Sequence, residues 1–417
     1  MKTQPKLSFK INSDSQDKSY LTIPIGEFAE VKGGIGFPVE LQGENTTEIP
    51  FFKVSDMELA GNERELLNAN NYVSLKSLSE NLKCNFFDKP AVVFAKVGAA
   101  LLLDRKRICR SKFLIDNNMM AVMPNTDICK LEYLYYDLLN KKLSNLSNTG
   151  ALPSINAYQI KEVVVKLPCI EEQQKTAEFF TALDEKIRIQ LNTVDKLNAI
   201  KTGMIAKVFS YENTLDWTVC KFDEIFAMNR TFPVSRDQIS DECDQTADNS
   251  KIIHYGDILT IYGNIVNPKS DSIGYLVTDV NAKDDDYLCD GDIVFADAAE
   301  DYTVGKAIEL DGVDCKLLSG LHTIAARPKI TFANGYLSYF FNSPIFKNQV
   351  RTLATGTKVM SLTKSSIQTT SIFFPSIEEQ QKVSNLLNTL DNKIEISKKK
   401  VNALKQLKKA FMQRMFV

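Results

Sequence analysis

An octapeptide, PCIEEQQK at residues 168–175, returns as PSIEEQQK at residues 375–382, 207 positions further along the chain. When residues 168–209 are aligned at that offset with residues 375–416, without a gap, 16 of the 42 positions are identical. Agreement of this extent at one fixed offset indicates an internal duplication. We therefore expect the chain to fold as two related units and to carry out its function twice.

Apolar residues in the two repeated segments recur at steps of three and four, which predicts a long amphipathic helix in each. A proline followed by paired glutamates is typical of a helix start, because acidic side chains favour the positive end of the helix dipole. Since both copies present the same face, we predict that they pack as an antiparallel coiled coil about a pseudo-two-fold axis. The predicted interface residues are Ile170, Phe180, Leu183, Ile187, Val194, Leu197, Ile200, Met204, Ile377, Leu387, Leu390, Ile394, Val401, Leu404, Leu407 and Phe411.

The segments that precede the helices repeat more loosely. VVFAK at residues 92–96 aligns with IVFAD at 293–297, and AVMP at 121–124 aligns with AARP at 325–328. Short β-rich runs broken by Gly, Pro and Asn predict a mixed α/β domain of roughly 140 residues before each helix. The predicted fold class is thus α+β, two tandem mixed α/β domains separated by two long helices. The predicted parts are an N-terminal extension (1–19), a first domain (20–167), a central helix (168–210), a second domain (211–374) and a C-terminal helix (375–417).

Composition limits the classes of function. The net charge is −2 and the pI about 6.0, which argues against a strongly basic nucleic-acid binder, so any DNA contact must be local. The eight cysteines are scattered singly and the two histidines have no metal-type spacing, so we predict reduced thiols and no metal site. No apolar run reaches the roughly 18 residues of a membrane span, and we expect a cytoplasmic protein without membrane partners.

Several motifs together resemble the specificity subunits of type I restriction-modification systems. They are the P-x-I-E-E-Q-Q-K helix starts, the L-D-x-K-I segments at 183–187 and 390–394, and the phenylalanines at the helix ends. The resemblance runs from about Leu21 to Val417. It implies that each globular domain is a target recognition domain for one half of a split double-stranded DNA sequence. It also implies that the helices set the spacing and dock two modification (methyltransferase) subunits.

The resemblance further implies that S-adenosylmethionine is used by the partner methyltransferase, with no cofactor bound by this chain. It leaves open whether ATP-dependent restriction (nuclease) subunits also bind. Consistent with a non-catalytic chain, there is no G-x-x-x-x-G-K-[ST] phosphate loop, and Asn267-Pro268-Lys269 lacks the second proline of an adenine methyltransferase run. Asp184-x-Lys186 and Asp391-x-Lys393 are interpreted as surface pairs on the helices. We predict no catalytic residue.

Where the two domains align, the frame is shared but the polar residues differ: Lys96 lies opposite Asp297, and Met123 opposite Arg327. Such exchanges suit two different half-sites, because an arginine such as Arg327 can fork onto O6 and N7 of a guanine, whereas an aspartate can accept a hydrogen bond from cytosine N4. The run DRKRICRSK at 104–112 is the clearest candidate phosphate patch, the alternative being a solvated hairpin tip. The predicted DNA-binding residues are Lys96, Arg105, Lys106, Arg107, Arg110, Lys112, Lys269, Lys306, Arg327 and Lys358.

Two other functions stay open on the sequence alone. One is a non-catalytic scaffold whose coiled coil holds two protein-binding domains, which the acidic pI slightly favours. The other is a fused restriction-type enzyme that methylates DNA by itself, which the missing motifs oppose.

Overall fold

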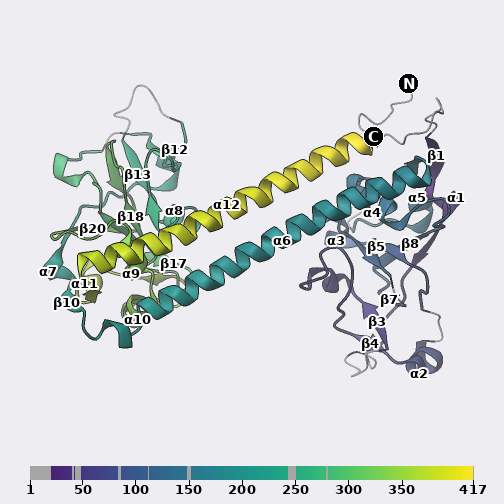
Figure 1. The fold of residues 1–417 in the computed structure, drawn as a ribbon, viewed down its shortest axis with the longest axis horizontal. Helices are drawn as coiled ribbons and strands as arrows, with labels where there is room; N and C mark the ends of the chain where they lie inside the picture. The colour runs from purple at the N-terminus through teal and green to yellow at the C-terminus, as the bar shows by residue number, and fades with distance from the viewer. Residues whose placement is uncertain are drawn as a thin grey trace. The chain divides into compact units, whose positions relative to one another are not determined.

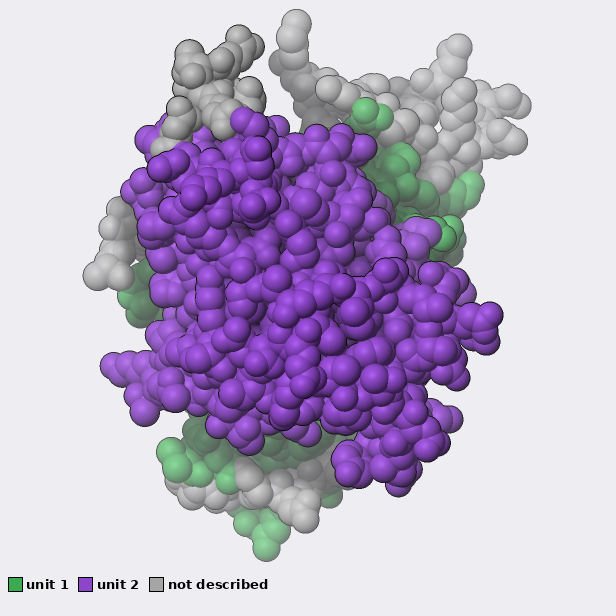
Figure 2. Space-filling model, turned by 90° about the vertical axis from the view of Figure 1, so that its left-hand side faces the viewer, with its two compact units in different colours: residues 1–190, 400–417 green, residues 191–399 purple. Residues whose placement is uncertain are grey.

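The computed structural model describes residues 20–39, 42, 48–82, 86–110, 112–147, 152–242, 250–278 and 280–416; the predicted N-terminal extension, residues 1–19, lies outside them. The chain divides into two compact units, which Figure 2 colours separately: unit 1 comprises residues 1–190 and 400–417, and unit 2 residues 191–399. Each unit therefore contains one globular domain and part of both long helices. Within the described ranges, no helix has the length and apolar character needed to cross a membrane.

Unit 1 is built on a four-stranded sheet in the order β2-β8-β5-β6, in which all neighbours are antiparallel. Its strands are β2 (Ala29–Gly33), β5 (Ala91–Ala95), β6 (Lys106–Cys109) and β8 (Met119–Pro124). β5 and β8 are buried along their whole length, which is why they are continuous apolar runs rather than alternating ones. Helix α4 (Leu131–Asn140) packs against this sheet, and a second sheet joins β4 (Tyr72–Val73), β3 (Ile49–Phe52) and β7 (Leu114–Ile115).

Unit 2 is built on a five-stranded sheet in the order β11-β20-β16-β18-β14. Its strands are β11 (Phe226–Met228), β14 (Ile265–Val266), β16 (Ile293–Ala296), β18 (Ala307–Leu310) and β20 (Thr323–Pro328). Helix α9 (Tyr336–Phe341) packs against β18. The smaller elements are a sheet of β12 (Ile239–Ser240), β15 (Tyr275–Leu276), β13 (Lys251–Ile253) and β19 (Leu317–Ser319), and the pair β17 (Ala298–Ala299) and β21 (Met360–Ser361).

The two sheets repeat one another strand by strand. β2, β8, β5 and β6 of unit 1 correspond in order to β11, β20, β16 and β18 of unit 2. The register also agrees, since Val92 pairs with Val122 and Ile293 pairs with Ala326. This is the register that the alignment of residues 92–96 with 293–297 and of 121–124 with 325–328 requires. The predicted pair of homologous α/β domains is therefore confirmed.

Each domain is closed by pairing its first strand with its last. β1 (Leu21–Pro24) pairs antiparallel with β9 (Val164–Leu167), and β10 (Thr218–Lys221) pairs in the same way with β22 (Ser371–Phe374). The long helix follows directly on the closing strand in each case. The remaining helices are α1 (Ile25–Phe28), α2 (Leu75–Ser77), α3 (Gly98–Leu102), α5 (Ala157–Lys161), α7 (Phe222–Ile225), α8 (Tyr255–Thr260), α10 (Pro344–Leu353) and α11 (Lys364–Gln368).

The two long helices, drawn teal and yellow in Figure 1, are α6 (Ile170–Val208) and α12 (Ile377–Met415), each of 39 residues. In unit 1 the first part of α6 lies against the last part of α12, with the rings of Phe179 and Phe411 5.1 Å apart. In unit 2 the last part of α6 lies against the first part of α12, where Lys201 and Asp391 form an ion pair. The helix segments are thus antiparallel in both units, as predicted.

The helix seam follows a heptad, in which positions a and d recur every seven residues and face the partner helix. All of these positions are buried or half-buried. In α6 they are Gln173, Thr176, Phe180, Leu183, Ile187, Gln190, Val194, Leu197, Lys201, Met204 and Val208. In α12 they are Gln380, Val383, Leu387, Leu390, Ile394, Ser397, Val401, Leu404, Lys408, Phe411 and Met415.

Four predicted interface residues lie outside this seam: Ile170, Ile200, Ile377 and Leu407. Ile200, Leu407 and Ile377 are 50%, 45% and 49% exposed, so their assignment to the interface was wrong. The reason is the spacing: seven residues after Val194 the seam reaches Lys201, and Ile200 falls on the flank. The prediction used hydrophobicity alone and therefore chose Ile200 instead of Lys201, the adjacent residue that faces the seam. Ile170, on the first turn of α6, is half-buried.

The repeated octapeptide contains the joint between each domain and its helix. The side chain of Gln173 is buried, accepts a hydrogen bond from the backbone N of Lys130 (2.9 Å) and donates to the carbonyls of Ile128 and Pro168 (3.0 Å each). Gln380 repeats this arrangement, accepting from the backbone N of Ala333 and donating to the carbonyl of Pro375, both at 3.0 Å. Because the donor and the acceptor of each buried amide are both hydrogen-bonded, the amide holds the first turns of the long helix in place against its domain.

Candidate nucleic-acid interface

Lys106, at the centre of the predicted phosphate patch, is a structural residue. Its side chain is completely buried on β6, where the ammonium donates to the carbonyl of Lys141 (2.9 Å) and pairs with Asp104 (2.7 Å). Burial lowers the pKa of this lysine, and its Asp104 partner counteracts that effect. A buried ammonium with these partners cannot reach a DNA phosphate, so the prediction for Lys106 was wrong.

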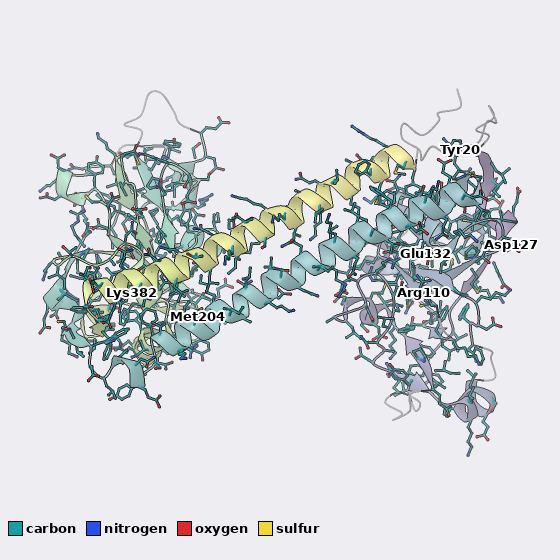
Figure 3. The ribbon with its side chains drawn as sticks, in the orientation of Figure 1. Tyr20, Arg110, Asp127, Glu132, Met204 and Lys382 are labelled. Atoms are coloured by element: carbon teal, nitrogen blue, oxygen red, sulfur yellow. The ribbon has the colours of Figure 1, made fainter. Side chains whose placement is uncertain are left out.

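The neighbouring arginines are also engaged within unit 1. Arg107 is half-buried and donates to the carbonyls of Asn62 and Met57, the latter at 3.0 Å. Arg110 forks onto Glu65 at 2.9 Å for both contacts and reaches Glu132 on α4 at 2.7 Å. Figure 3 labels Arg110 and Glu132 in this unit. Hydrogen bonding to Glu65 raises the pKa of Arg110 above its ordinary value, which stabilises the bound, charged form.

Most of the run at 104–112 therefore braces the domain from within instead of forming a free phosphate patch. Arg105 at the edge of the run pairs with the exposed Glu58. Lys112 is exposed, with its ammonium 4.9 Å from the centre of the Phe86 ring. Because exposed ion pairs and cation–π contacts are weak, these two side chains can exchange their partners for phosphates.

Arg327 in unit 2 makes a bidentate contact with a carboxylate. Its guanidinium donates to Asp292 at 2.9 and 2.7 Å and to the carbonyl of Tyr287 at 2.8 Å. Asp292 is completely buried, so this pair holds β20 to the turn before β16. Hydrogen bonding to Asp292 raises the pKa of Arg327. A fork of Arg327 onto a guanine would require breaking its ion pair with the buried Asp292, so the structure argues against that role.

The remaining predicted lysines differ in their availability. Lys306 is half-buried and donates to the carbonyls of Leu259 (3.3 Å) and Tyr262 (3.1 Å), and burial lowers its pKa, so it too serves the fold. Lys269 pairs at 3.1 Å with Asp314, and both side chains are exposed. Lys358 is exposed, and Lys96 is partly exposed directly after β5. The structure thus leaves Lys96, Arg105, Lys112, Lys269 and Lys358 as candidate DNA contacts.

A duplicated polar cluster on the helices was missed by the sequence interpretation. In unit 1, Asp184 accepts hydrogen bonds from Tyr136 on α4 (2.8 Å) and from Lys408 on α12 (2.5 Å). In unit 2, Asp391 accepts from Tyr339 on α9 (2.8 Å) and pairs with Lys201. Each cluster ties a domain to both helices, so Asp184 and Asp391 are not the surface pairs that their spacing from Lys186 and Lys393 suggested.

The signal for these clusters was present in the repeat. Asp184 and Asp391 align at the offset of 207 residues, as do Lys201 and Lys408. Polar residues that stay identical through a diverged repeat, at heptad positions in the seam (Lys201, Lys408) or directly beside it (Asp184, Asp391), point to a buried polar contact. Among the described residues, no group of three or more His, Cys, Asp or Glu side chains is arranged to hold a metal ion.

Comparison with known proteins agrees with this architecture. The sequence matches the family described as type I restriction modification DNA specificity domain twice, at residues 18–202 and 215–406. It is similar to the type I restriction enzyme MjaVIII specificity subunit of Methanocaldococcus jannaschii, 23% identical over 333 residues, which cover 72% of this chain and 73% of that protein. The putative type I restriction enzyme MjaX specificity subunit of the same organism is 24% identical over 344 residues, covering 77% and 76%.

Solved structures share the fold. The crystal structure of a type I restriction-modification S subunit from M. genitalium superposes with a TM-score of 0.58 at 13% sequence identity, covering 100% of this chain and 99% of that one. A chain from a structure describing complex assembly and conformational transition of a type I R-M system gives a TM-score of 0.57 at 14% identity, covering 97% and 99%.

Proposed function

Because the chain belongs to the type I restriction modification DNA specificity family, we propose that it reads a split DNA sequence, one half with each globular domain. The observation that carries this proposal is the repeated sheet, whose order and register are the same in both units while Lys96 and Asp297 carry opposite charges at a matching position. A shared frame with exchanged polar groups suits two half-sites of different sequence, because each base pair presents its own pattern of donors and acceptors.

The test is selection of DNA by the full-length chain. A pool of duplexes with a long randomised segment is incubated with the purified chain near physiological salt, and the bound fraction is sequenced. The expected result is two short motifs separated by a fixed number of unspecified base pairs. Failure to enrich any motif, or enrichment of one continuous motif, would contradict the proposal and favour the protein-binding scaffold.

We further propose that this chain carries out no chemistry and that two modification subunits, which use S-adenosylmethionine, methylate the DNA that it selects. The absent phosphate-loop and methyltransferase motifs support the first part, and the duplicated helix supports the number two. Transfer of a labelled methyl group from S-adenosylmethionine to the selected DNA should require the co-expressed modification subunit. Methylation by this chain alone would refute the division of labour.

The helices offer a duplicated apolar surface for those subunits. Ile189 and Leu407 are 53% and 45% exposed in unit 1, and Ile396 and Ile200 are 53% and 50% exposed in unit 2. The offset of 207 residues relates Ile189 to Ile396 and Ile200 to Leu407. The heptad places these residues at positions c and g, on the same flank of the pair, with about 6 Å along the helix axis between the two members of each patch.

An exposed apolar pair that occurs twice at equivalent positions is more than scattered surface hydrophobicity. We propose that each patch docks one modification subunit through an apolar contact. Flanking lysines at the same edge, Lys186 and Lys400, favour a partner with acidic residues around its apolar contact.

Replacing both members of one patch, Ile189→Ser with Leu407→Ser, should lower the number of bound modification subunits from two to one, measured by the mass of the co-expressed complex. The control is Leu191→Ser, which removes an apolar side chain of similar exposure (39%) from the opposite flank of α6. Two bound subunits in the doubly substituted chain would exclude this surface.

The helices are also proposed to set the gap between the half-sites. Each is continuous for 39 residues. Adding one heptad to both, between Leu191 and Val194 and between Lys398 and Val401, keeps the seam in register and lengthens each helix by about 10 Å. DNA selection with this variant should return the same two motifs with a gap wider by about 3 base pairs. An unchanged gap would show that another part of the chain measures it.

A further inference from the structure

One end of the central sheet in unit 2 gathers polar side chains from three adjacent strands. Asp297 follows β16, His322 precedes β20 and Asn229 follows β11. Because the strands lie in the order β11-β20-β16 and neighbours are antiparallel, these three positions are at the same end of the sheet. The imidazole Nδ1 of His322 lies 3.3 Å from the carboxylate Oδ1 of Asp297, and the backbone N of Asp297 donates to the carbonyl of His322 (3.0 Å).

The polar groups of this strand-end cluster are incompletely satisfied. The side-chain nitrogen Nδ2 of Asn229 is buried and has no hydrogen-bond partner among the described residues. Lys364 donates to the backbone carbonyl of Asn229 at 3.0 Å, which brings a cation to the same place. Burial raises the pKa of Asp297, and His322 and Lys364 oppose this rise. A buried donor without an acceptor is unfavourable, which is a reason to expect a ligand or a bridging water here.

Unit 1 has the same arrangement with different chemistry. Lys96 follows β5 as Asp297 follows β16, and its backbone N donates to the carbonyl of Asn118 (2.8 Å), the counterpart of His322. The ammonium of Lys96 lies against the end of β2, 3.0 Å from the position that a Cβ on Gly33 would occupy. The two domains thus place an ammonium and a carboxylate at equivalent points of equivalent sheets.

The polar clusters on the helices repeat unchanged in the two units, whereas the strand-end position does not. Asp184 and Asp391, which hold the scaffold together, are identical through the repeat, as are Gln173 and Gln380. A scaffold role for the strand-end position would favour the same kind of contact in both domains. The exchange of lysine for aspartate inverts the charge and turns a hydrogen-bond donor into an acceptor, which is the change that reading a different base edge requires.

We propose that Asp297 reads one base pair of the half-site assigned to the second domain, by accepting a hydrogen bond from an exocyclic amino group in the major groove. The amino group is cytosine N4 or adenine N6. His322 positions the carboxylate. Lys96 occupies the equivalent place for the other half-site, where its ammonium donates to an acceptor such as guanine O6 or N7. This inference rests on the proposed function, since it names the residues that do the reading.

The test compares DNA selection by the full-length chain and by Asp297→Asn, which keeps the shape of the side chain and removes its charge and one acceptor. Discrimination at a single base pair of one half-site should fall roughly tenfold, with the other half-site unchanged. A G·C pair at that position identifies cytosine N4 as the contact, and an A·T pair identifies adenine N6. Lys96→Met should relax one position of the opposite half-site.

The matched control is Asp223→Asn, which makes the same charge change at an exposed position on α7, before β11 and so at the far end of that strand. It should leave both motifs intact. His322→Asn provides a second variant of the cluster, because asparagine tolerates the left-handed backbone of His322 (φ 57°) and is the residue found in unit 1. It should relax the same base pair as Asp297→Asn.

The outcomes separate this inference from the proposed function. If the wild-type chain selects a split motif and a folded cluster variant selects it with undiminished discrimination, the strand-end assignment is wrong and the proposed function stands. If the wild-type chain selects no motif, the proposed function fails, and this inference, which rests on it, fails as well.

Discussion

The duplicated helix cluster predicts a specific pattern of coupling energies. The perturbation is a double-mutant cycle in unit 1 that combines Asp184→Asn with Lys408→Met. Asp184 accepts from Lys408 at 2.5 Å and from Tyr136 at 2.8 Å, and the Lys408 ammonium lies 5.3 Å from the centre of the Tyr136 ring. Both charged side chains are nearly buried, at 19% and 18% exposure. The pair is therefore poorly screened by solvent.

Hydrogen bonds to charged groups contribute about 1.5–3 kcal/mol. Part of this stabilisation of Asp184 comes from its hydrogen bond with Tyr136, and the cost of removing the two charges from water offsets another part. We therefore expect a coupling free energy of about 1–2 kcal/mol between Asp184 and Lys408. For a unit of about 200 residues each kcal/mol shifts the melting temperature by about 2–4 °C, so the effect is measurable.

The assay is urea unfolding of the wild-type chain, the two single variants and the double variant, at about 0.1 M and 1 M salt. Glu185 and Arg188 serve as the control pair on the same helix, because both are exposed (49% and 60%) and should couple only weakly at low salt. High salt should abolish the coupling of the control pair and spare most of the other. Equal couplings in the two cycles would refute the argument that burial makes the cluster strong.

Two further predictions concern buried charges in unit 2. Glu309 accepts hydrogen bonds from the backbone N of Gly335 and of Ser338, and burial raises its pKa to about 7. Since protonation relieves the cost of a buried charge, the free energy of unfolding of the wild type should rise as the pH falls from 8 to 4.5. Relative to Glu309→Gln, the rise should reach up to about 3 kcal/mol. Melting temperatures of both proteins across that range check this; a difference independent of pH would contradict it. Arg327→Met leaves Asp292 buried without its cation and should lower the free energy of unfolding, measured in urea, by about 3–5 kcal/mol. The control Lys269→Met, whose partner Asp314 is exposed, should lower it by under about 0.5 kcal/mol. Equal losses in the two variants would exclude a structural role for Arg327.

The long helices were predictable because their information is local and periodic. A heptad repeats over 39 residues, and the same pattern is present twice, so chance agreement is small. The central strands were predictable for a related reason, since AVVFA at 91–95 and IVFA at 293–296 are buried on both faces and contain only apolar residues. Their pairing followed from aligning the two halves.

The roles of individual basic residues were not predictable from the run that contains them. Glu65, which holds Arg110, and Asn62, which holds Arg107, lie 45 residues earlier in the chain. Nothing within residues 104–112 indicates that these partners fold back onto β6. Charge density along a sequence reports the number of cations, whereas their availability depends on carboxylates and carbonyls that only the tertiary fold brings near.

The same limit explains the error at Ile200. Hydrophobicity favours Ile200 over its neighbour Lys201 as the residue that faces the seam. In the structure Lys201 lies in the seam, because its ammonium forms an ion pair with Asp391 and lies over the ring of Tyr339. A lysine stem is long and apolar enough to lie in a helix seam when its ammonium is paired at the edge. Prediction from apolar periodicity therefore fails where a polar partner on another segment changes the preference.

An internal duplication supplies a comparison that a single domain lacks, because the chain contains two solutions to the same folding problem. Polar residues that are identical in both copies, such as Gln173 and Gln380, have corresponding backbone partners in both units. Residues that occupy equivalent places with opposite charge, such as Lys96 and Asp297, cannot have the same partners, so at least one of them is selected by something other than the shared scaffold. Under the proposed function, the external partner that differs between the two domains is the DNA half-site. The positions where the repeat inverts its charge are therefore better candidates for base contacts than the positions where positive charge is most abundant.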